Sequence, residues 1–205
     1  MPPVVSTLKY LSVYGSGRQL ELAAEFVKYI LRRAWEAGEE VYEKAKEIVE
    51  EGMLRGSQTL RNFEKKVEVD GKTYVVKVID GEAVEEDRGG KKLLRLKIAA
   101  EVGRVEGEHT IVDRVVREYT ITYSRRRADN VAEGYAYASA KAPGGRKADA
   151  ERFSALVEAL TGKKPRVYQR SDGNIMIECG REHLDGFMRF AELADAIERW
   201  LEETG

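Results

Sequence analysis

Residues 63–78 of the chain read FEKKVEVDGKTYVVKV, and this stretch decides the fold of the region around it. Apolar and charged residues alternate on both sides of Asp70-Gly71, with the period of a half-buried strand. Asp-Gly is the typical sequence of a two-residue type I′ turn, because both turn positions need a positive φ. Such a turn pairs Val67 with Tyr74 across the two strands. The residues then expected on one face of the hairpin are Phe63, Val67, Tyr74, Val76 and Val78.

Two further strands are expected after the hairpin. The third strand has apolar residues at every second position, namely Leu94, Leu96, Ile98, Ala100 and Val102. The fourth strand places on one face Ile111, Val115, Tyr119, Ile121 and Tyr123. The acidic, glycine-bearing segment 80–92 is expected to form a loop between the second and third strands. Four sequential strands with short connections favour an antiparallel meander.

The residues before this sheet have the spacing of helices. Ser16 and Gln19 are separated as in a capping box, in which each side chain satisfies a free backbone N–H group. Apolar residues recur with a helical period on both sides of Gly38, which interrupts the pattern. The segment is therefore either one helix that ends near Met53 or two helices that meet at Gly38. Its other face is rich in glutamate, which is typical of a solvated helix face.

Three helices and a second hairpin are expected after the sheet. An Ala-rich helix should follow Arg125-Arg126-Arg127 and end near Lys141, where Ala-Pro-Gly-Gly breaks it. A second helix should end with Gly162 in the C′ position. A hairpin with its turn at residues 171–173 follows, and the apolar period from Leu184 to Leu201 predicts a long last helix.

The expected fold class is therefore α+β. It comprises an N-terminal helix or helix pair, a four-stranded antiparallel meander, then helix, helix, β-hairpin and a long C-terminal helix. We expect residues 1–57 to form an N-terminal helical segment and residues 58–205 an α+β domain. The apolar face of the sheet has to be covered by helices, so we expect the two parts to pack together as one unit.

Composition limits the classes of function. The 205 residues include 35 basic and 36 acidic side chains, so no whole-molecule attraction to nucleic acid is expected. A single cysteine excludes an intrachain disulfide, and the chain has no apolar run long enough to span a bilayer. We expect a cytoplasmic protein without a membrane partner and without a cofactor. Few amide side chains with many Glu, Lys and Arg residues are typical of hyperthermophile proteins.

Long blocks in the second part of the chain are similar to a known family. They are VDGKTYVVKVIDG at 69–81, REYTITY at 117–123, and, from Ala142 to Gly205, APGGRKADAERFSALVEALTGKKPRVYQRSDGNIMIECGREHLDGFMRFAELADAIERWLEETG. Together these blocks resemble PaRep two-b, a paralogous repeat-protein family of hyperthermophilic crenarchaea. The resemblance implies an archaeal, thermophilic protein whose relatives vary in length. It implies no catalytic residues, because that family has no assigned activity.

A second resemblance concerns the order of elements. The two strands, helix, hairpin and helix expected between Leu93 and Glu203 look like one half of a LAGLIDADG homing-endonuclease domain. The chain has strands where that family has its defining helix, which delivers a metal-binding carboxylate. This resemblance therefore implies a degenerate, homing-endonuclease-like protein without a metal site.

One residue pair could carry chemistry. Cys179 and His183 lie at the start of the last predicted helix, where a thiolate could be activated by a histidine base. Cys179, however, has the parity of Ile175 and Ile177 and is expected to face the core. We therefore predict no catalytic and no metal-binding residues.

The charge distribution carries the functional prediction. Thirteen basic and six acidic residues lie between Arg114 and Arg170, with Tyr119, Tyr123, Tyr135, Tyr137 and Tyr168 among them. Cations that contact phosphates and aromatic rings that stack on bases are what single-strand binding requires. The predicted nucleic-acid-binding residues are Arg125, Arg126, Arg127, Arg146, Lys147, Lys163, Lys164, Arg166, Arg170, Tyr123 and Tyr168. The alternatives are surface ion networks and core tyrosines, or a protein-interaction module that self-associates through the N-terminal helices.

Overall fold

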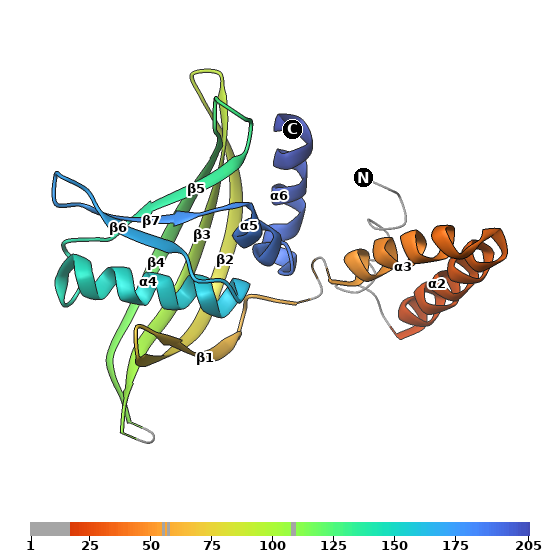
Figure 1. Cartoon of the computed structure of the whole chain (residues 1–205). Helices are drawn as coiled ribbons and strands as arrows, with labels where there is room; N and C mark the ends of the chain where they lie inside the picture. Colours follow the sequence, from red (N-terminus) through yellow and green to blue (C-terminus); the bar gives the residue numbers. More distant parts are fainter. Residues whose placement is uncertain (1–16, 55, 57, 108–109) are drawn as a thin grey trace. The chain divides into compact units, whose positions relative to one another are not determined.

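The computed structural model describes residues 17–54, 56, 58–107 and 110–205 (Figure 1). The chain divides into two compact units. The first comprises Met1–Thr59 with Arg189–Ala191, and the second Leu60–Met188 with Glu192–Gly205. Helices and one antiparallel sheet make up the described residues, so the predicted α+β class is confirmed.

The first unit contains a pair of helices, α2 (Gly17–Ala37) and α3 (Glu39–Leu54). Gly38 separates them with a φ of +125°, a value that residues with a side chain rarely adopt. Of the two alternatives left open by the sequence, the helix pair is correct. The rings of Trp35 and Tyr42 meet edge to face across the junction, with their centroids 5.1 Å apart. Ser16 lies outside the described residues, so the capping box stays a prediction.

The second unit is built on a seven-stranded sheet in the order β1-β2-β3-β4-β5-β7-β6, with all neighbours antiparallel. Its strands are β1 (Glu64–Val69), β2 (Lys72–Arg88), β3 (Lys91–Glu106), β4 (Thr110–Arg125), β5 (Ala132–Tyr137), β6 (Arg166–Gln169) and β7 (Ile175–Cys179). The predicted first hairpin is confirmed. Val67 pairs with Tyr74, and Asp70 and Gly71 both have positive φ angles, as a type I′ turn requires.

The predicted loop at 80–92 is wrong. Strand β2 continues through this segment to Arg88, and the connection to β3 is the two-residue turn Gly89-Gly90, with φ angles of 60° and 78°. A shift in the pairing register between Val78 and Asp80 changes which residues face inward. This bulge interrupts the alternation of apolar and polar residues, so a pattern-based reading ends the strand too early.

The predicted Ala-rich helix before Lys141 is also wrong, because residues 132–137 form strand β5. The small residues Ala132, Gly134 and Ala136 occupy alternate, buried positions. A Cβ atom on Gly134 would lie 2.6 Å from Cζ of Tyr123, so only glycine allows the two strands to pair here. The ring of Tyr123 on the neighbouring strand requires small residues at these positions. Helix propensity depends only on the local sequence, so it cannot reveal this requirement.

The predicted long C-terminal helix is two helices, α5 (Arg181–Phe187) and α6 (Ala191–Thr204). At the break, the Gln58 N–H donates to the Arg189 carbonyl (3.0 Å), and the Ala191 N–H donates to the Gln58 carbonyl (2.8 Å). Backbone groups that would have continued the helix are thus engaged by a residue more than a hundred positions away. The apolar period continues across the break, which explains why the sequence predicts one helix.

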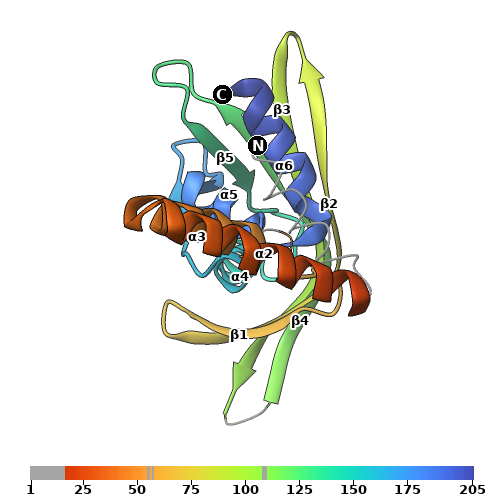
Figure 2. The same cartoon turned by 90° about the vertical axis from the view of Figure 1, so that its right-hand side faces the viewer.

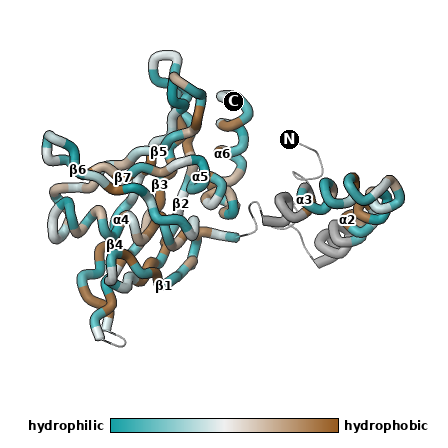
Figure 3. The backbone as a smooth tube through the Cα atoms, viewed as in Figure 1, coloured by the Kyte–Doolittle hydropathy of each residue, from teal (hydrophilic) through white to brown (hydrophobic). Residues whose placement is uncertain are grey.

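Helix α4 (Gly145–Thr161) lies inside the curl of the sheet. It contacts β1, β2 and β3 on one side and β7 on the other, and most of its second half is buried (Figures 1 and 2). Gly162 ends it with a φ of 70°, as predicted. The strands supply alternating apolar residues to this core, visible as brown segments of β2–β4 in Figure 3.

None of the described helices combines the length and the apolar composition that a membrane crossing requires.

Candidate functional site

The predicted nucleic-acid-binding residues fall into two groups. Arg125, Arg126 and Arg127 follow the end of β4, where they line a cavity of about 440 Å³ together with Lys92 and Glu203. Tyr123 precedes this group, and its side chain is fully buried. The ring of Tyr123 is therefore not available to stack on a base.

The second group surrounds the edge strand β6. Lys147 from α4 and Lys164 line a groove of about 320 Å³ that also includes Val167 of β6. The residues of this group are Arg146, Lys147, Lys163, Lys164, Arg166, Tyr168 and Arg170. The curl of the sheet brings the first turn of α4 beside β6, so residues about twenty positions apart become neighbours.

Several of these cations already have partners. Arg125 donates to the carbonyl of Leu201 and to the hydroxyl of Thr204, and its guanidinium lies 5.1 Å from the ring centre of Trp200. Arg126 binds the carboxylates of Asp129 and Glu133, and the Arg126 guanidinium lowers the pKa of Asp129. Lys164 Nζ lies 2.5 Å from an oxygen of Asp70. Arg125 thus belongs to the end of α6 rather than to a free basic surface.

Three tyrosines lie on the outer face of the short strands, away from α4. The β-sheet register aligns Tyr137, Met176 and Tyr168 across β5, β7 and β6, and it places Tyr135 on the same face. Tyr137 is 51% exposed. Tyr135 and Tyr137 were noted among the tyrosines between the cations but were not included in the predicted site, and the segment that contains them was predicted to be a helix. The alternation Tyr-Ala-Tyr, read as a strand, would have found them.

The surroundings of these tyrosines fix their orientation. The Arg166 guanidinium lies 5.4 Å from the ring centre of Tyr168, and Arg170 donates to the hydroxyl of Tyr137 (3.2 Å). The hydroxyl of Tyr135 donates to Glu133 (2.6 Å), a bond that raises the pKa of Tyr135, as does partial burial. We refer to Tyr135, Tyr137, Tyr168, Arg166 and Arg170 as the tyrosine face.

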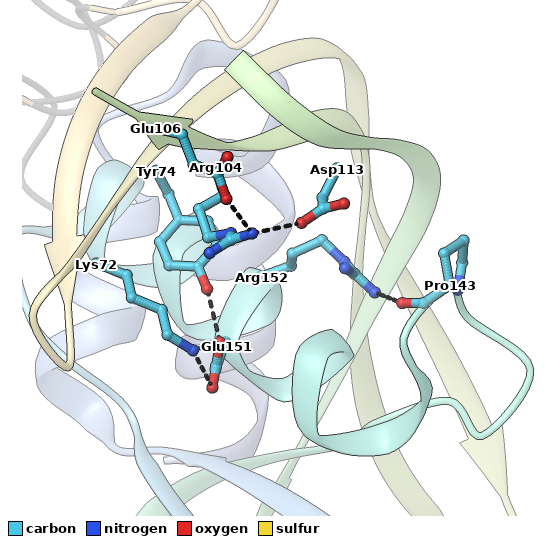
Figure 4. Close-up of polar contacts among 8 residues, drawn as sticks. All are labelled: Lys72, Tyr74, Arg104, Glu106, Asp113, Pro143, Glu151 and Arg152. Atoms are coloured by element: carbon cyan, nitrogen blue, oxygen red, sulfur yellow. Dashed lines mark hydrogen bonds and ion pairs between the residues drawn. The ribbon is translucent and has the colours of Figure 1, made fainter. Parts of the chain in front are cut away.

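A polar cluster lies on the other side of the sheet, where α4 meets the inner faces of β2 and β3 (Figure 4). Lys72 and the hydroxyl of Tyr74 both donate to Glu151, at 2.8 and 2.7 Å. Arg104 binds Asp113 at 3.0 Å and Glu106 at 2.6 Å. Burial raises the pKa of Tyr74, as does its bond to Glu151, so the phenol stays protonated.

A second ion pair lies deeper, between β4 and α4. Arg117 Nη1 donates to Asp149 Oδ2 (3.0 Å), and the same oxygen accepts the N–H of Ser139 (2.7 Å). Asp149 has no exposed surface, so this pair joins β4 to α4 within the core. Burial raises the pKa of the adjacent Tyr119 to about 12.

The Cys179–His183 pair has no free base. His183 Nδ1 accepts the N–H of Gly180 (3.0 Å), and Nε2 lies 3.2 Å from the carbonyl of Lys164. Cys179 is fully buried, as its parity predicted, and burial raises the pKa of its thiol to about 12. Nδ1 thus contacts the backbone at the start of α5 and Nε2 the backbone before β6, so His183 joins these two segments.

Among residues 17–54, 56, 58–107 and 110–205 there is no group of three or more His, Cys, Asp and Glu side chains that could hold a metal ion. When the chain is compared with protein-family models, with curated proteins and with solved structures, no match is found.

Proposed function

We propose that the protein binds single-stranded nucleic acid on the tyrosine face. The observation that supports this is the alignment of Tyr137 and Tyr168 on one exposed sheet face, with Arg166 and Arg170 beside them. Aromatic rings on a sheet form a platform on which unpaired bases stack, and arginines contact the phosphates. Bases in a duplex are stacked on each other, so such a platform selects single strands.

The two exposed rings start from strands that are not adjacent in the sheet. One strand, β7, separates β5 from β6, so the rings of Tyr137 and Tyr168 originate roughly 10 Å apart, twice the distance between adjacent strands. Met176 lies between them and is buried, so it supports the platform from below. The platform therefore offers two stacking positions, with Tyr135 as a third contact.

Charge contributes less than stacking on this face. Arg166 and Arg170 are accompanied by Glu178 and Glu133, which leaves no strong positive field. If only the two arginines contact phosphates, the logarithm of affinity should fall with the logarithm of salt concentration with a slope of about −1.4. A slope of about −4 or steeper would mean that another, more basic surface binds the strand.

The test is a titration of fluorescein-labelled oligo-dT and oligo-U 12-mers by fluorescence anisotropy. We expect Tyr137→Ala and Tyr168→Ala each to weaken binding about tenfold, because stacking contributes about 1–3 kcal/mol per base. Tyr29→Ala is the matched control, since Tyr29 is 53% exposed but lies on α2. Equal affinities of the wild type and both tyrosine-face variants would rule out this site.

The helix pair supports a second candidate function, which is self-association. Three aromatic residues of α2 are exposed, namely Phe26, Tyr29 and Trp35, and Trp35 is 64% exposed. Large exposed aromatic side chains are enriched at protein interfaces. Analytical ultracentrifugation of the 23.1 kDa chain would test this. A dimer that dissociates in Trp35→Ala but persists in Tyr137→Ala is the expected result, and a monomer at about 100 μM would exclude it.

A further inference from the structure

Arg152 is a buried arginine whose ion pair and hydrogen bonds are incomplete. Arg152 on α4 has a side chain that is only 5% exposed. Its closest carboxylate oxygen, Oδ1 of Asp149, lies 3.9 Å away, while the other oxygen of Asp149 is already bound by Arg117 at 3.0 Å. Two largely buried arginines therefore share a single buried carboxylate.

The hydrogen bonds of Arg152 are also incomplete. Its Nη2 atom donates to the carbonyl of Pro143, as Figure 4 shows. Its Nε atom has no hydrogen-bond partner among the described residues. A buried charge is costly unless it is paired and hydrogen-bonded, because the protein interior replaces little of the solvation lost from water. The position of Arg152 therefore leaves one N–H donor for a further partner.

Arg152 lines a pocket that could admit such a partner. The pocket has a volume of about 160 Å³, and Lys72, Tyr74, Arg104 and Asp113 contribute to its wall. Lys72 and Asp113 at the mouth are 43% and 63% exposed, so the pocket opens to solvent. Three of its lining residues are cationic and two, Asp113 and Glu151, are anionic.

Neither of these two carboxylates is free to serve Arg152. Asp113 is bound by Arg104, and Glu151 is bound by both Lys72 and Tyr74, which lower the pKa of Glu151 and keep it ionised. Arg104 also pairs with Glu106, so Arg152 is the lining cation whose hydrogen bonds are incomplete. Tyr74, Arg104 and Arg152 all contribute to the lining of this pocket, and Figure 4 shows the three side chains in one cluster.

We propose that this pocket is a binding site for a small oxyanion, with Arg152 at its base and Arg104 and Lys72 at its mouth. The volume is about five times the share of one water molecule in the liquid, which is about 30 Å³. A phosphate group or a carboxylate with a few accompanying waters fits this space. Guanidinium groups bind both kinds of oxyanion through paired N–H donors.

The site is independent of the tyrosine face. Tyr74 and Arg104 are paired across β2 and β3 on the inner side of the sheet, against α4, whereas the tyrosine face is on the outer side. Loss of oligonucleotide binding would leave the anion site intact, and the reverse also holds.

The experiment follows the arginine Nε–H signals in ¹H–¹⁵N NMR spectra of the full chain, with the Arg152 signal assigned through Arg152→Lys. Sodium phosphate, sulfate and acetate are titrated at an ionic strength held constant with sodium chloride. We expect the chemical shift of the Arg152 signal to change with anion concentration, and this change to saturate at millimolar concentrations of one of these anions. Saturation by phosphate and sulfate identifies a phosphate-type ligand, and saturation by acetate alone identifies a carboxylate.

Two variants complete the test without disturbing the core. Arg104→Gln, at the mouth, should weaken the saturating anion about tenfold, the effect of losing one charge-assisted hydrogen bond. Arg114→Gln is the control, because Arg114 is 56% exposed and pairs with Glu101 outside the pocket. Arg152 shifts that stay linear up to about 50 mM anion, or an affinity unchanged in Arg104→Gln, would overturn the proposal.

Discussion

Cys179 shows how burial sets the chemistry of a single residue. Its thiol is enclosed between the sheet and α5, and its pKa is raised to about 12 because the charged thiolate is disfavoured there. We expect the native protein at pH 8 to react with Ellman's reagent at a small fraction of the rate of the urea-unfolded chain. Stoichiometric reaction within minutes in the native state would contradict the packing described for this residue.

The raised pKa of the Cys179 thiol also makes the free energy of unfolding depend on pH. Because the folded pKa lies above the unfolded value, the contribution of the thiol is fully present below about pH 9. It is lost as the pH rises from about 9 toward 12, where the unfolded chain is deprotonated first. Compared with Cys179→Ala, the wild type should therefore lose unfolding free energy across this range. The control is the interval from pH 6 to 8, where the difference should stay constant.

Individual residues also show where sequence reasoning contradicts itself. The period of the fourth strand placed Tyr123 on the face of Tyr119 and Ile121, which is the buried face. The functional prediction nevertheless used Tyr123 as a stacking residue because basic residues follow it. The two-residue period of the strand predicted the side chain of Tyr123 correctly, because it indicates which face a side chain lies on. Proximity in sequence to a cation gives no such information.

At the scale of elements, Arg125 ties the end of β4 to the last turn of α6. It donates to the carbonyl of Leu201 and the hydroxyl of Thr204 and covers the ring of Trp200. A cation at a helix C-terminus also interacts favourably with the helix dipole. We expect Arg125→Met to lower the unfolding free energy by about 1–2 kcal/mol and to speed hydrogen exchange in the last turn of α6.

The matched control for this prediction is Arg127→Met, because Arg127 lies two residues further on and is exposed. Arg125→Lys should rescue only part of the loss, since an ammonium group cannot make the same set of directed bonds. A melting temperature unchanged in Arg125→Met would show that the contacts of Arg125 do not stabilise α6.

The elements that the sequence predicted correctly are those whose determinants are local. The Asp70-Gly71 turn, the alternation of β3 and the Gly162 cap are each encoded within a few residues. The elements that it missed depend on distant partners. Strand β5 needs the ring of Tyr123, and the break between α5 and α6 needs the backbone of Gln58.

At the scale of the whole sheet, both candidate sites depend on its curvature and strand order, which bring residues of different elements together. Lys72 and Arg104 reach Arg152 only because α4 lies inside the sheet. The sequence gives no signal for this pocket, since its residues run from Lys72 to Arg152 and belong to four elements, β2, β3, β4 and α4. Tyr137 and Tyr168 likewise become neighbours through β7, a strand that follows both in sequence.

The two-glycine turn between β2 and β3 has a consequence for how quickly the parts of the sheet assemble. The pairs of this hairpin begin with Arg88 and Lys91, next to the turn, and end with Tyr74 and Arg104. Because the first pairs are close in sequence, closing the hairpin costs little chain entropy. The pairs of β5 with β7 are further apart in sequence, with α4 between the two strands, and contacts of large sequence separation slow folding. Leu96→Ala should therefore mainly slow refolding in stopped-flow experiments, and Ile177→Ala should mainly speed unfolding.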